Sequence, residues 1–270
     1  MNDTQTTANP LGYEKIGKLL TSYAVPSIIA LIINSLYNMV DQIFIGQGVG
    51  FLGNGATNII APIATITIAI AALFGDGLAA FFSLSLGKGE GEKAAKGLGT
   101  SIMFGSIFGI IWTALAFAFL KPLCLIFGAT ENILPYALDY GRIIVLGFTF
   151  QIIGNTINSA IRTDGSPRYA MLAMMIGAVL NLILDPVFIF VFHWGVEGAA
   201  IATVASQLFG LLFNIAYLFR LKTIKLSRQS FTLDIRTAGR IASLGFASGA
   251  NNLTSTVVAF VSNNLMTKYG

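Results

Sequence analysis

The stretch SIIALIINSLYNMVDQIFIG, residues 27–46, places an acid, Asp41, inside an apolar run that is long enough to cross a membrane. A second such run, MLAMMIGAVLNLILDPVFIFVF at residues 171–192, contains Asp185. A carboxylate at bilayer depth costs about 2.5–3.5 kcal/mol even on the lenient insertion scales. Acids retained at that depth are mostly functional, so these two residues are the first candidates for a site.

The composition of the chain is that of a membrane protein. Its 270 residues are 55% hydrophobic and 10% charged, whereas a soluble domain carries about 25% charged residues. The single cysteine, Cys124, rules out a disulfide or a thiolate metal site within the chain. The net charge of +4 is spread over connections rather than gathered in one patch, so we expect no nucleic-acid partner.

Seven apolar stretches are long enough to cross a hydrocarbon core of about 30 Å, which needs about 20 helical residues. They are residues 20–46, 57–86, 98–120, 133–161, 169–192, 197–219 and 240–267. We therefore expect an all-α, polytopic membrane protein. Its predicted parts are a cytoplasmic tail at 1–19, a six-helix lobe at 20–222, a cytoplasmic loop at 223–239 and the first helix of a second lobe at 240–270.

The basic residues predict the orientation of these helices. Thirteen of the 16 Lys and Arg fall in the tail and in alternate connections, and only Lys121, Arg142 and Lys268 fall on the other side. Because basic residues concentrate in cytoplasmic loops, the N-terminus is predicted to be cytoplasmic. The polar start, MNDTQTTANPLGYEKIGK, is too long for the basic region of a signal peptide and is expected to be an uncleaved tail.

A weak internal sequence repeat supports the division into two predicted lobes. The segment KLLTSYAVPSIIALIINS at 18–35 resembles GRIASLGFASGANNLTST at 239–256, with an offset of 221 residues. Secondary transporters are often built from such repeats. If the repeat holds, residue 240 opens a second six-helix lobe, and the end of the chain at TKYG, directly after an apolar run, is expected to be a truncation.

Four of the predicted helices carry polar residues on one face, at spacings of three, four and seven. Such faces must turn away from lipid. A rise of about 1.5 Å per residue puts Asp41, Asp185 and Thr203 roughly 8–11 Å below the outer surface, where they can meet. The four faces are Asn34, Tyr37, Asn38 and Asp41; Gln151, Asn155, Asn158 and Arg162; Asn181 and Asp185; and Thr203, Gln207, Gly210 and Asn214.

Other interpretations stay open for single residues. An isolated Asn in these faces can simply hydrogen-bond a neighbouring helix, and a buried acid can be a permanently protonated structural group. Asn155 and Asn158 come out deeper in the membrane by the same count. Asp76, towards the cytoplasmic end of 57–86, can snorkel or cap there, and its role is open. Pro186 removes a backbone donor and frees a carbonyl beside Asp185.

With these residues in place, the chain resembles the multidrug and toxic compound extrusion (MATE) family, nearest its DinF-like and MepA-like bacterial members. The resemblance depends on YNMVDQIFIGQG at 37–48, SLGKGEGEKA at 85–94, NSAIRTDGSPR at 158–168, LNLILDPVFIF at 180–190 and GVEGAAIATVASQ at 195–207. It implies two six-helix lobes around a central cavity, in a monomer of the bacterial cytoplasmic (inner) membrane. It also implies cation-coupled export of amphipathic or cationic drugs.

The resemblance further implies roles for particular residues. Asp41 and Asp185, with Asn181 and Thr203, would form a site that responds to protons or sodium. The expected substrate cavity is lined by Asn34, Tyr37, Asn155, Asn158 and Gln207. No cofactor is expected beyond the coupling ion, H⁺ or Na⁺. If that ion is sodium, Asp41, Asn181, Asp185 and Thr203 would supply its oxygen ligands.

Three alternatives differ from an antiporter in class. A flippase of lipid-linked oligosaccharides would be expected to line its cavity with Arg or Lys, whereas these faces are acidic and rich in amides. An intramembrane aspartyl protease needs two acids that share a proton, and Leu73 replaces the glycine of its usual signature in LFGDG, so we expect no enzyme. A non-transporting fragment is the third alternative.

The predicted topology can be tested by labelling. A reporter fused after Arg228 is expected to be cytoplasmic, and a cysteine at Gly195 is expected to react with an impermeant reagent from outside, because the basic residues concentrate on the side of Arg228. Labelling of residue 228 from outside would overturn the whole helix assignment.

Overall fold

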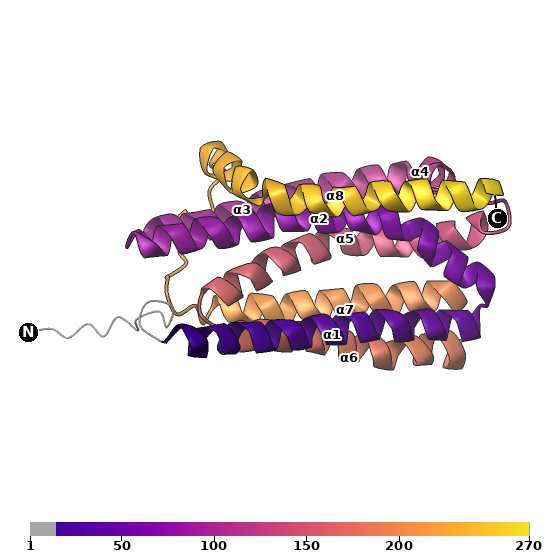
Figure 1. Ribbon diagram of the computed structural model, residues 1–270, viewed down its shortest axis with the longest axis horizontal. Coiled ribbons are helices and arrows are strands. Elements are labelled where there is room, and N and C mark those ends of the chain that lie inside the picture. Colours follow the sequence, from indigo (N-terminus) through magenta and orange to yellow (C-terminus); the bar gives the residue numbers. More distant parts are fainter. Residues whose placement is uncertain (1–14, 270) are drawn as a thin grey trace, which may run out of the picture.

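The computed structural model describes residues 15–269, and this part of the chain is almost entirely helical (Figure 1). Its long helices run side by side, joined by short turns, with one irregular connection before the last helix. The elements are α1 (Ile16–Gly48), α2 (Phe51–Gly87), α3 (Gly91–Ala118), α4 (Leu120–Ile126), α5 (Leu134–Thr163), α6 (Pro167–Pro186) with a π-helical turn η2 (Val187–Val191), α7 (Gly195–Leu218), a 3₁₀ turn η3 (Arg228–Ser230) and α8 (Ile235–Tyr269).

The helices form two groups with α5 between them. Helices α1, α6 and α7 lie together along one side, and α2, α3 and α8 along the other (Figure 1). Helix α5 packs against α2 and α3 on one side and α7 and α6 on the other, so it joins the two groups. The space for a site therefore lies between α1, α5, α6 and α7.

Within the described residues, six helices are long and apolar enough to cross a membrane: α1, α2, α3, α5, α6 with η2, and α7. They correspond to the first six predicted crossings. Helix α8 is continuous but carries Asn251, Asn252 and Thr254 near its middle, so its described residues are less apolar. Its crossing of the membrane stays a prediction.

The helices extend beyond the apolar stretches that predicted them. α1 begins at Ile16 rather than 20, α3 at Gly91 rather than 98, and α8 at Ile235 rather than 240. Backbone hydrogen bonding continues into polar residues at the ends of a helix, where hydrophobicity gives no signal. The tail before α1 is accordingly shorter than predicted, and the connection before α8 runs over 219–234 rather than 223–239. Residues 1–14 of the tail lie outside the described residues.

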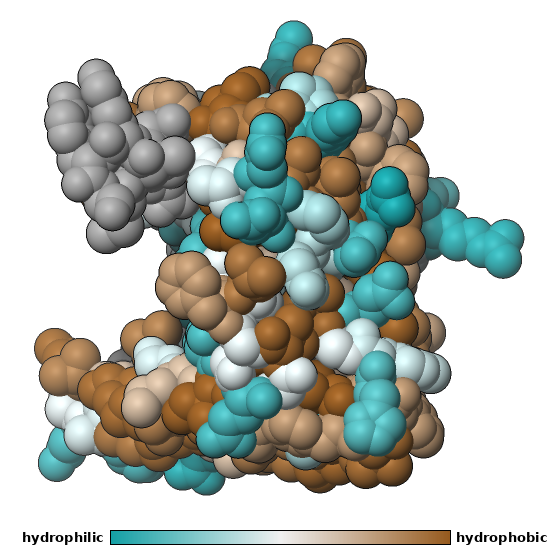
Figure 2. Space-filling model, turned by 90° about the vertical axis from the view of Figure 1, so that its right-hand side faces the viewer, coloured by the Kyte–Doolittle hydropathy of each residue, from teal (hydrophilic) through white to brown (hydrophobic). Residues whose placement is uncertain are grey.

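The sides of the bundle are apolar, as lipid contact requires. Large hydrophobic side chains such as Leu31, Ile111, Ile183 and Phe209 are exposed. Figure 2, which faces the right-hand end of the molecule in Figure 1, shows hydrophobic residues around the sides and hydrophilic ones distributed over the end.

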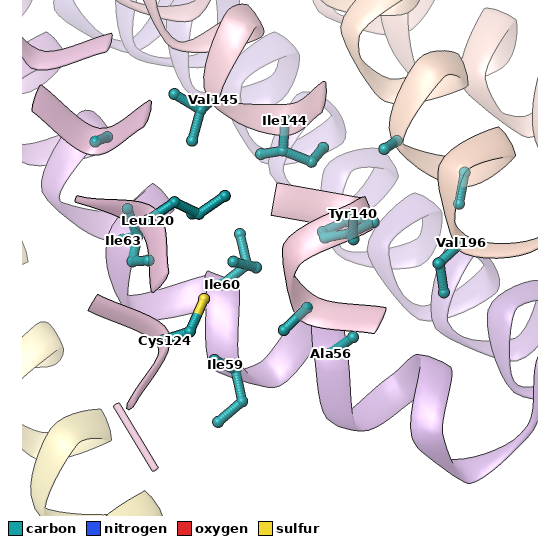
Figure 3. Close-up of a cluster of buried hydrophobic side chains, with 14 of the residues drawn as sticks. Ala56, Ile59, Ile60, Ile63, Leu120, Cys124, Tyr140, Ile144, Val145 and Val196 are labelled. Carbon is teal, nitrogen blue, oxygen red and sulfur yellow. The ribbon is translucent and has the colours of Figure 1, made fainter. Parts of the chain in front are cut away.

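A buried cluster holds the end of the bundle where α1 turns into α2. Ile60 and Ile63 of α2 lie against Leu120 and Cys124 of α4, while Tyr140 of α5 lies towards α7 (Figure 3). The short helix α4 was not predicted, because its seven residues directly continue the apolar run of α3. It closes this end of the core.

At the opposite end, Asp164 anchors the segment that leaves α7. Its carboxylate is 1% exposed and accepts hydrogen bonds from the Tyr217 hydroxyl at 2.8 Å, the Lys222 N–H at 2.8 Å and the Thr223 N–H at 2.9 Å. A buried carboxylate with several donors is well compensated. Asp164 therefore fixes the start of the connection to α8 against the turn between α5 and α6.

Helices α2 and α8 cross in direct backbone contact. A Cβ atom on Gly77 would overlap the Ile241 carbonyl oxygen, and one on Gly245 would overlap the Leu73 carbonyl oxygen. Small residues at a membrane helix crossing let two backbones approach this closely. The two glycines thus determine how α8 packs against the six-helix group, which consists of α1, α2, α3, α5, α6 and α7.

The crossing predicts the effect of one added methyl group. Gly245→Ala should lower the melting temperature of the purified protein, because extra carbon in a filled contact costs about 1–3 kcal/mol. Gly239→Ala on the same helix is the matched control, since nothing lies within 4 Å of its added Cβ and alanine favours a helix. Equal melting temperatures for the two variants, measured by thermal unfolding in detergent, would contradict the crossing.

The structure also refines the labelling position on the side that is predicted to be outer. Gly195 has a φ of 56°, which a cysteine adopts poorly, whereas Glu197 is exposed in the first turn of α7. A cysteine at Glu197 probes the same connection without backbone strain.

Candidate functional site

A cavity of about 390 Å³ lies between α1, α2, α5, α6 and α7. Amides and hydroxyls make up most of its polar wall, and aliphatic side chains and glycines the rest. Its polar lining residues are Asn34, Tyr37, Asn38, Gln151, Asn155, Asn158, Asn181, Thr203, Ser206, Gln207 and Asn214. The polar faces of four helices thus turn inward onto one space.

The two acids lie beside this cavity rather than on its surface. Asp41 of α1 is 8% exposed and Asp185 of α6 is fully buried, and their carboxyl groups contact each other. Two carboxyl groups at such close range repel each other when both are ionised. Either they share a proton, or a cation between them compensates the two negative charges. The pair is therefore a place where one positive charge can be exchanged for another.

Asn181 connects the acid pair to the cavity. Its Nδ2 donates to Oδ1 of Asp185 at 3.2 Å and to the Thr203 hydroxyl oxygen at 3.3 Å. A carboxylate accepts hydrogen bonds, so this contact fixes the orientation of the amide. The Asn181 Oδ1 is left as an acceptor on a residue that also lines the cavity.

A close approach of α6 and α7 brings Thr203 next to Asn181. Pro186 ends the regular α6 helix, and the chain continues as the π-helical turn η2. A Cβ on Gly198 of α7 would lie 2.9 Å from the Phe188 carbonyl oxygen of that turn, so only glycine fits there. Two small residues after it, Ala199 and Ala202, are fully buried.

The unused polar atoms around the site are mainly hydrogen-bond acceptors. Among the described residues, buried oxygens without a hydrogen-bond partner include Asp41 Oδ1, Asp185 Oδ2, Asn181 Oδ1, Gln207 Oε1 and Asn214 Oδ1. The amide of Asn214 is oriented because its Nδ2 donates to the Gly154 carbonyl at 3.1 Å. Its oxygen is thereby left unpaired.

Unpaired buried acceptors cost free energy until a donor or a cation satisfies them. A site with this balance suits a positively charged ligand or one rich in N–H groups. The oxygens of Asp41, Asp185, Asn181 and Thr203 are also the kind of ligand that a sodium ion takes. Within residues 15–269, no cluster of three or more His, Cys, Asp or Glu could hold a metal ion.

The other predicted site residues all line the large cavity. Asn34, Tyr37, Asn155 and Gln207 line the large cavity, and Asn158 lines it while its Nδ2 donates to the Ala170 carbonyl at 3.0 Å. Asn155 and Asn158 therefore belong to the same cavity as Asn181, although residue counting alone put them deeper.

Arg162 and Asp76 lie elsewhere. Arg162 donates to the Ser159 hydroxyl at 2.9 Å and lines a separate cavity of about 110 Å³ between α1, α5 and α6. Asp76 is exposed on α2 and lines none of the cavities described here. Ser206 is a cavity residue that sequence reasoning missed, because it lies one position before the polar stripe of α7.

Comparisons with known proteins agree with this geometry. The family model MatE matches residues 26–187. The multidrug export protein MepA of Staphylococcus saprophyticus is 28% identical over 260 residues, which cover 94% of this chain and 56% of that protein. An FAD transporter of Shewanella oneidensis is 29% identical over 223 residues, which cover 81% of this chain and 49% of that protein.

Solved structures give the same match. One, described as the outward-facing conformation of a multidrug resistance MATE family transporter of the MOP superfamily, superposes with a TM-score of 0.86 at 27% identity. The match covers 96% of this chain and 57% of that one. An inward-facing structure with the same description gives a TM-score of 0.79 at 28% identity, over 86% and 55% of the two chains. The chain spans about half the length of the curated relatives it matches.

Proposed function

Since this chain belongs to the MatE family, we propose that its six-helix part, residues 20–222, is one lobe of a secondary transporter that exports amphipathic or cationic compounds in exchange for a proton or a sodium ion. The 223–239 connection and α8 would then lead into a second lobe. The observation that carries this proposal is the set of unpaired acceptor oxygens beside the acid pair, which favours a positively charged ligand.

Exchange follows from the charge on the acid pair. With Asp41 and Asp185 jointly negative, a cationic substrate in the cavity gains an attraction that water screens poorly at this depth. A proton or a sodium ion on the pair removes that attraction, and the substrate leaves. Asn181 would transmit the change in charge from the pair to the cavity, because its amide donates to Asp185 and the residue also lines the cavity.

The setting of this transport is also a proposal. The matched relatives are transporters, and the chain has membrane-spanning helices. We expect a monomer in the bacterial cytoplasmic membrane, with the N-terminus in the cytoplasm and no cofactor beyond the coupling ion. Small drugs and the lipid bilayer would be its partners.

An anionic substrate is the second candidate, because one relative is described as an FAD transporter. A flavin dinucleotide carries two phosphate groups, which bind well to Arg or Lys. Within the described residues, no Lys or Arg lines the large cavity. The acceptor-rich wall therefore favours the cationic substrate, and the same reasoning disfavours a pyrophosphate-bearing lipid.

The acid pair predicts the first functional test. Asp41→Asn or Asp185→Asn should abolish efflux of a cationic dye such as ethidium while leaving membrane insertion intact, because each change removes the exchangeable charge but keeps the shape. Efflux is measured in cells that express the transporter at the full length of its relatives. Glu131→Gln, which removes an exposed acid outside the site, is the control and should transport normally.

Binding to the purified 270-residue chain separates substrate recognition from transport. Ethidium should bind more weakly as the pH falls, since protons compete for the acid pair, and the two Asn variants should lose this pH dependence.

In the efflux test, wild-type resistance to ethidium in cells carrying either variant would refute the assignment.

The coupling ion is tested at Thr203. Thr203→Val is nearly isosteric, removes one oxygen and keeps both acids. If sodium couples, the apparent affinity for sodium at fixed pH should fall about tenfold or more, since a ligand is lost where water replaces it poorly. If protons alone couple, as two adjacent acids favour, efflux should change little.

Thr65→Val is the matched control, because the Thr65 hydroxyl donates only to the Ala61 carbonyl on its own helix among the bonds the structure describes. A large loss of sodium affinity in Thr203→Val alone would show that sodium is the coupling ion. An equal loss in both variants would contradict a ligand role for Thr203.

A further inference from the structure

A second cavity, of about 360 Å³, lies at the other end of the bundle from the acid pair. It is formed where α2 ends, α3 begins and α8 begins, so it joins the six-helix group to the last helix. This end carries most of the basic residues of the chain. The lining residues are Phe81, Leu84, Ser85, Lys88, Glu90, Lys93, Lys96, Asp234, Arg236, Thr237 and Arg240.

Both acids of this cavity already have a partner. Glu90 accepts from Lys93 at 2.8 Å, and Asp234 is paired with Lys96 at 2.5 Å. The ammonium of Lys96 holds the pKa of the Asp234 carboxyl well below its usual range, so this acid stays ionised. Asp234 also accepts from the Thr237 N–H at 3.2 Å and thereby caps α8.

Three cations remain in excess in the cavity wall. Lys88 follows α2 directly, and Arg236 and Arg240 lie four residues apart on α8, which puts them on one face of that helix. Within the described part of the chain, none of the three is in a salt bridge. Lys88 and Arg240 both lie close enough to Glu90 to help lower the pKa of its carboxyl, and Arg236 lines the same cavity.

The shape and charge of the wall suit a phosphate group. Arginine side chains bind phosphate oxygens with paired N–H groups, and lysine adds a point charge. The first turn of α3 follows Glu90 and has no side-chain cap, so the N-terminus of this helix adds some positive partial charge near the cavity, which Glu92 in the same turn offsets in part. These donors together exceed what the two paired acids can use.

The remaining wall is apolar and distinguishes a lipid from a free phosphate. Leu84 and Phe81 lie about one and two turns before Lys88 along α2, and Leu84 is 51% exposed. A lipid places its phosphate among basic residues at the membrane surface and its acyl chains on hydrophobic side chains below. A soluble phosphate has no acyl chain that could contact this apolar wall.

We propose that this cavity binds the phosphate headgroup of an anionic phospholipid, which bridges the six-helix group and α8. Lys88, Arg236 and Arg240 hold the phosphate, and Phe81 and Leu84 contact the acyl chain. The site is separate from the acid pair and does not depend on the transported compound.

Native mass spectrometry of the purified 270-residue chain in detergent tests the proposal, with dioleoylphosphatidylglycerol and dioleoylphosphatidylcholine as probes. The chain should bind phosphatidylglycerol at least tenfold more tightly than phosphatidylcholine. The triple variant K88Q/R236Q/R240Q should lose this preference, since each basic residue near a membrane surface contributes about fivefold. The control R220Q/K225Q/R228Q removes three exposed charges from the same end and should keep it.

A second variant is expected to bind phosphatidylglycerol more tightly, and misfolding would not produce such a gain. Glu90→Gln removes a partly exposed acid from the wall and keeps the three cations, so phosphatidylglycerol should bind about fivefold more tightly. Circular dichroism checks the helix content of every variant.

Three results would overturn the proposal. The first is equal binding of phosphatidylglycerol by the two triple variants. The second is no gain of binding in Glu90→Gln. The third is binding of glycerol 3-phosphate, which carries the headgroup chemistry without acyl chains, as tight as that of the lipid; this would assign the site to a soluble phosphate.

Discussion

The structure depends on the requirement that polar groups in a membrane find partners inside the protein. Asp41 and Asp185 meet that requirement inside the protein: they contact each other, Asp41 also contacts the Gln42 side chain, and Asp185 accepts from the Asn181 amide. This forces α1 and α6 to turn their polar faces towards a shared interior. Helices α5 and α7 present amides to the same space, so one constraint orients four helices around one cavity.

The site and the scaffold use small residues for the same purpose at different places. Gly198 lets α7 approach the π-helical turn after α6, which brings Thr203 into contact with Asn181. Gly77 and Gly245 let α8 cross α2 at backbone distance. In both cases the absence of a Cβ decides which helices touch, and the polar groups then meet at the distances the packing allows.

The two cavities of the bundle differ in the sign of the charge that they favour. The cavity beside the acid pair offers acceptor oxygens and, among its described lining residues, no basic side chain, which suits positive charge. The cavity near the start of α8 carries more cations than acids, which suits negative charge. Buried Asp164, which accepts from Tyr217 near the end of α7 and from two N–H groups of the segment after it, belongs to neither cavity and holds that segment in place.

The sequence by itself determined the class of the fold, the first six of the seven predicted crossings and the polar faces, because hydrophobicity and helical spacing are local properties. It also singled out Asp41 and Asp185 as costly acids. Only the tertiary structure decided that Asn155 and Asn158 share a cavity with Asn181, that α4 closes the core, and that Asp164 anchors a distant segment. Those facts depend on which helices touch each other. Helix tilt and close glycine contacts determine these neighbours, and neither leaves a periodic pattern in the sequence.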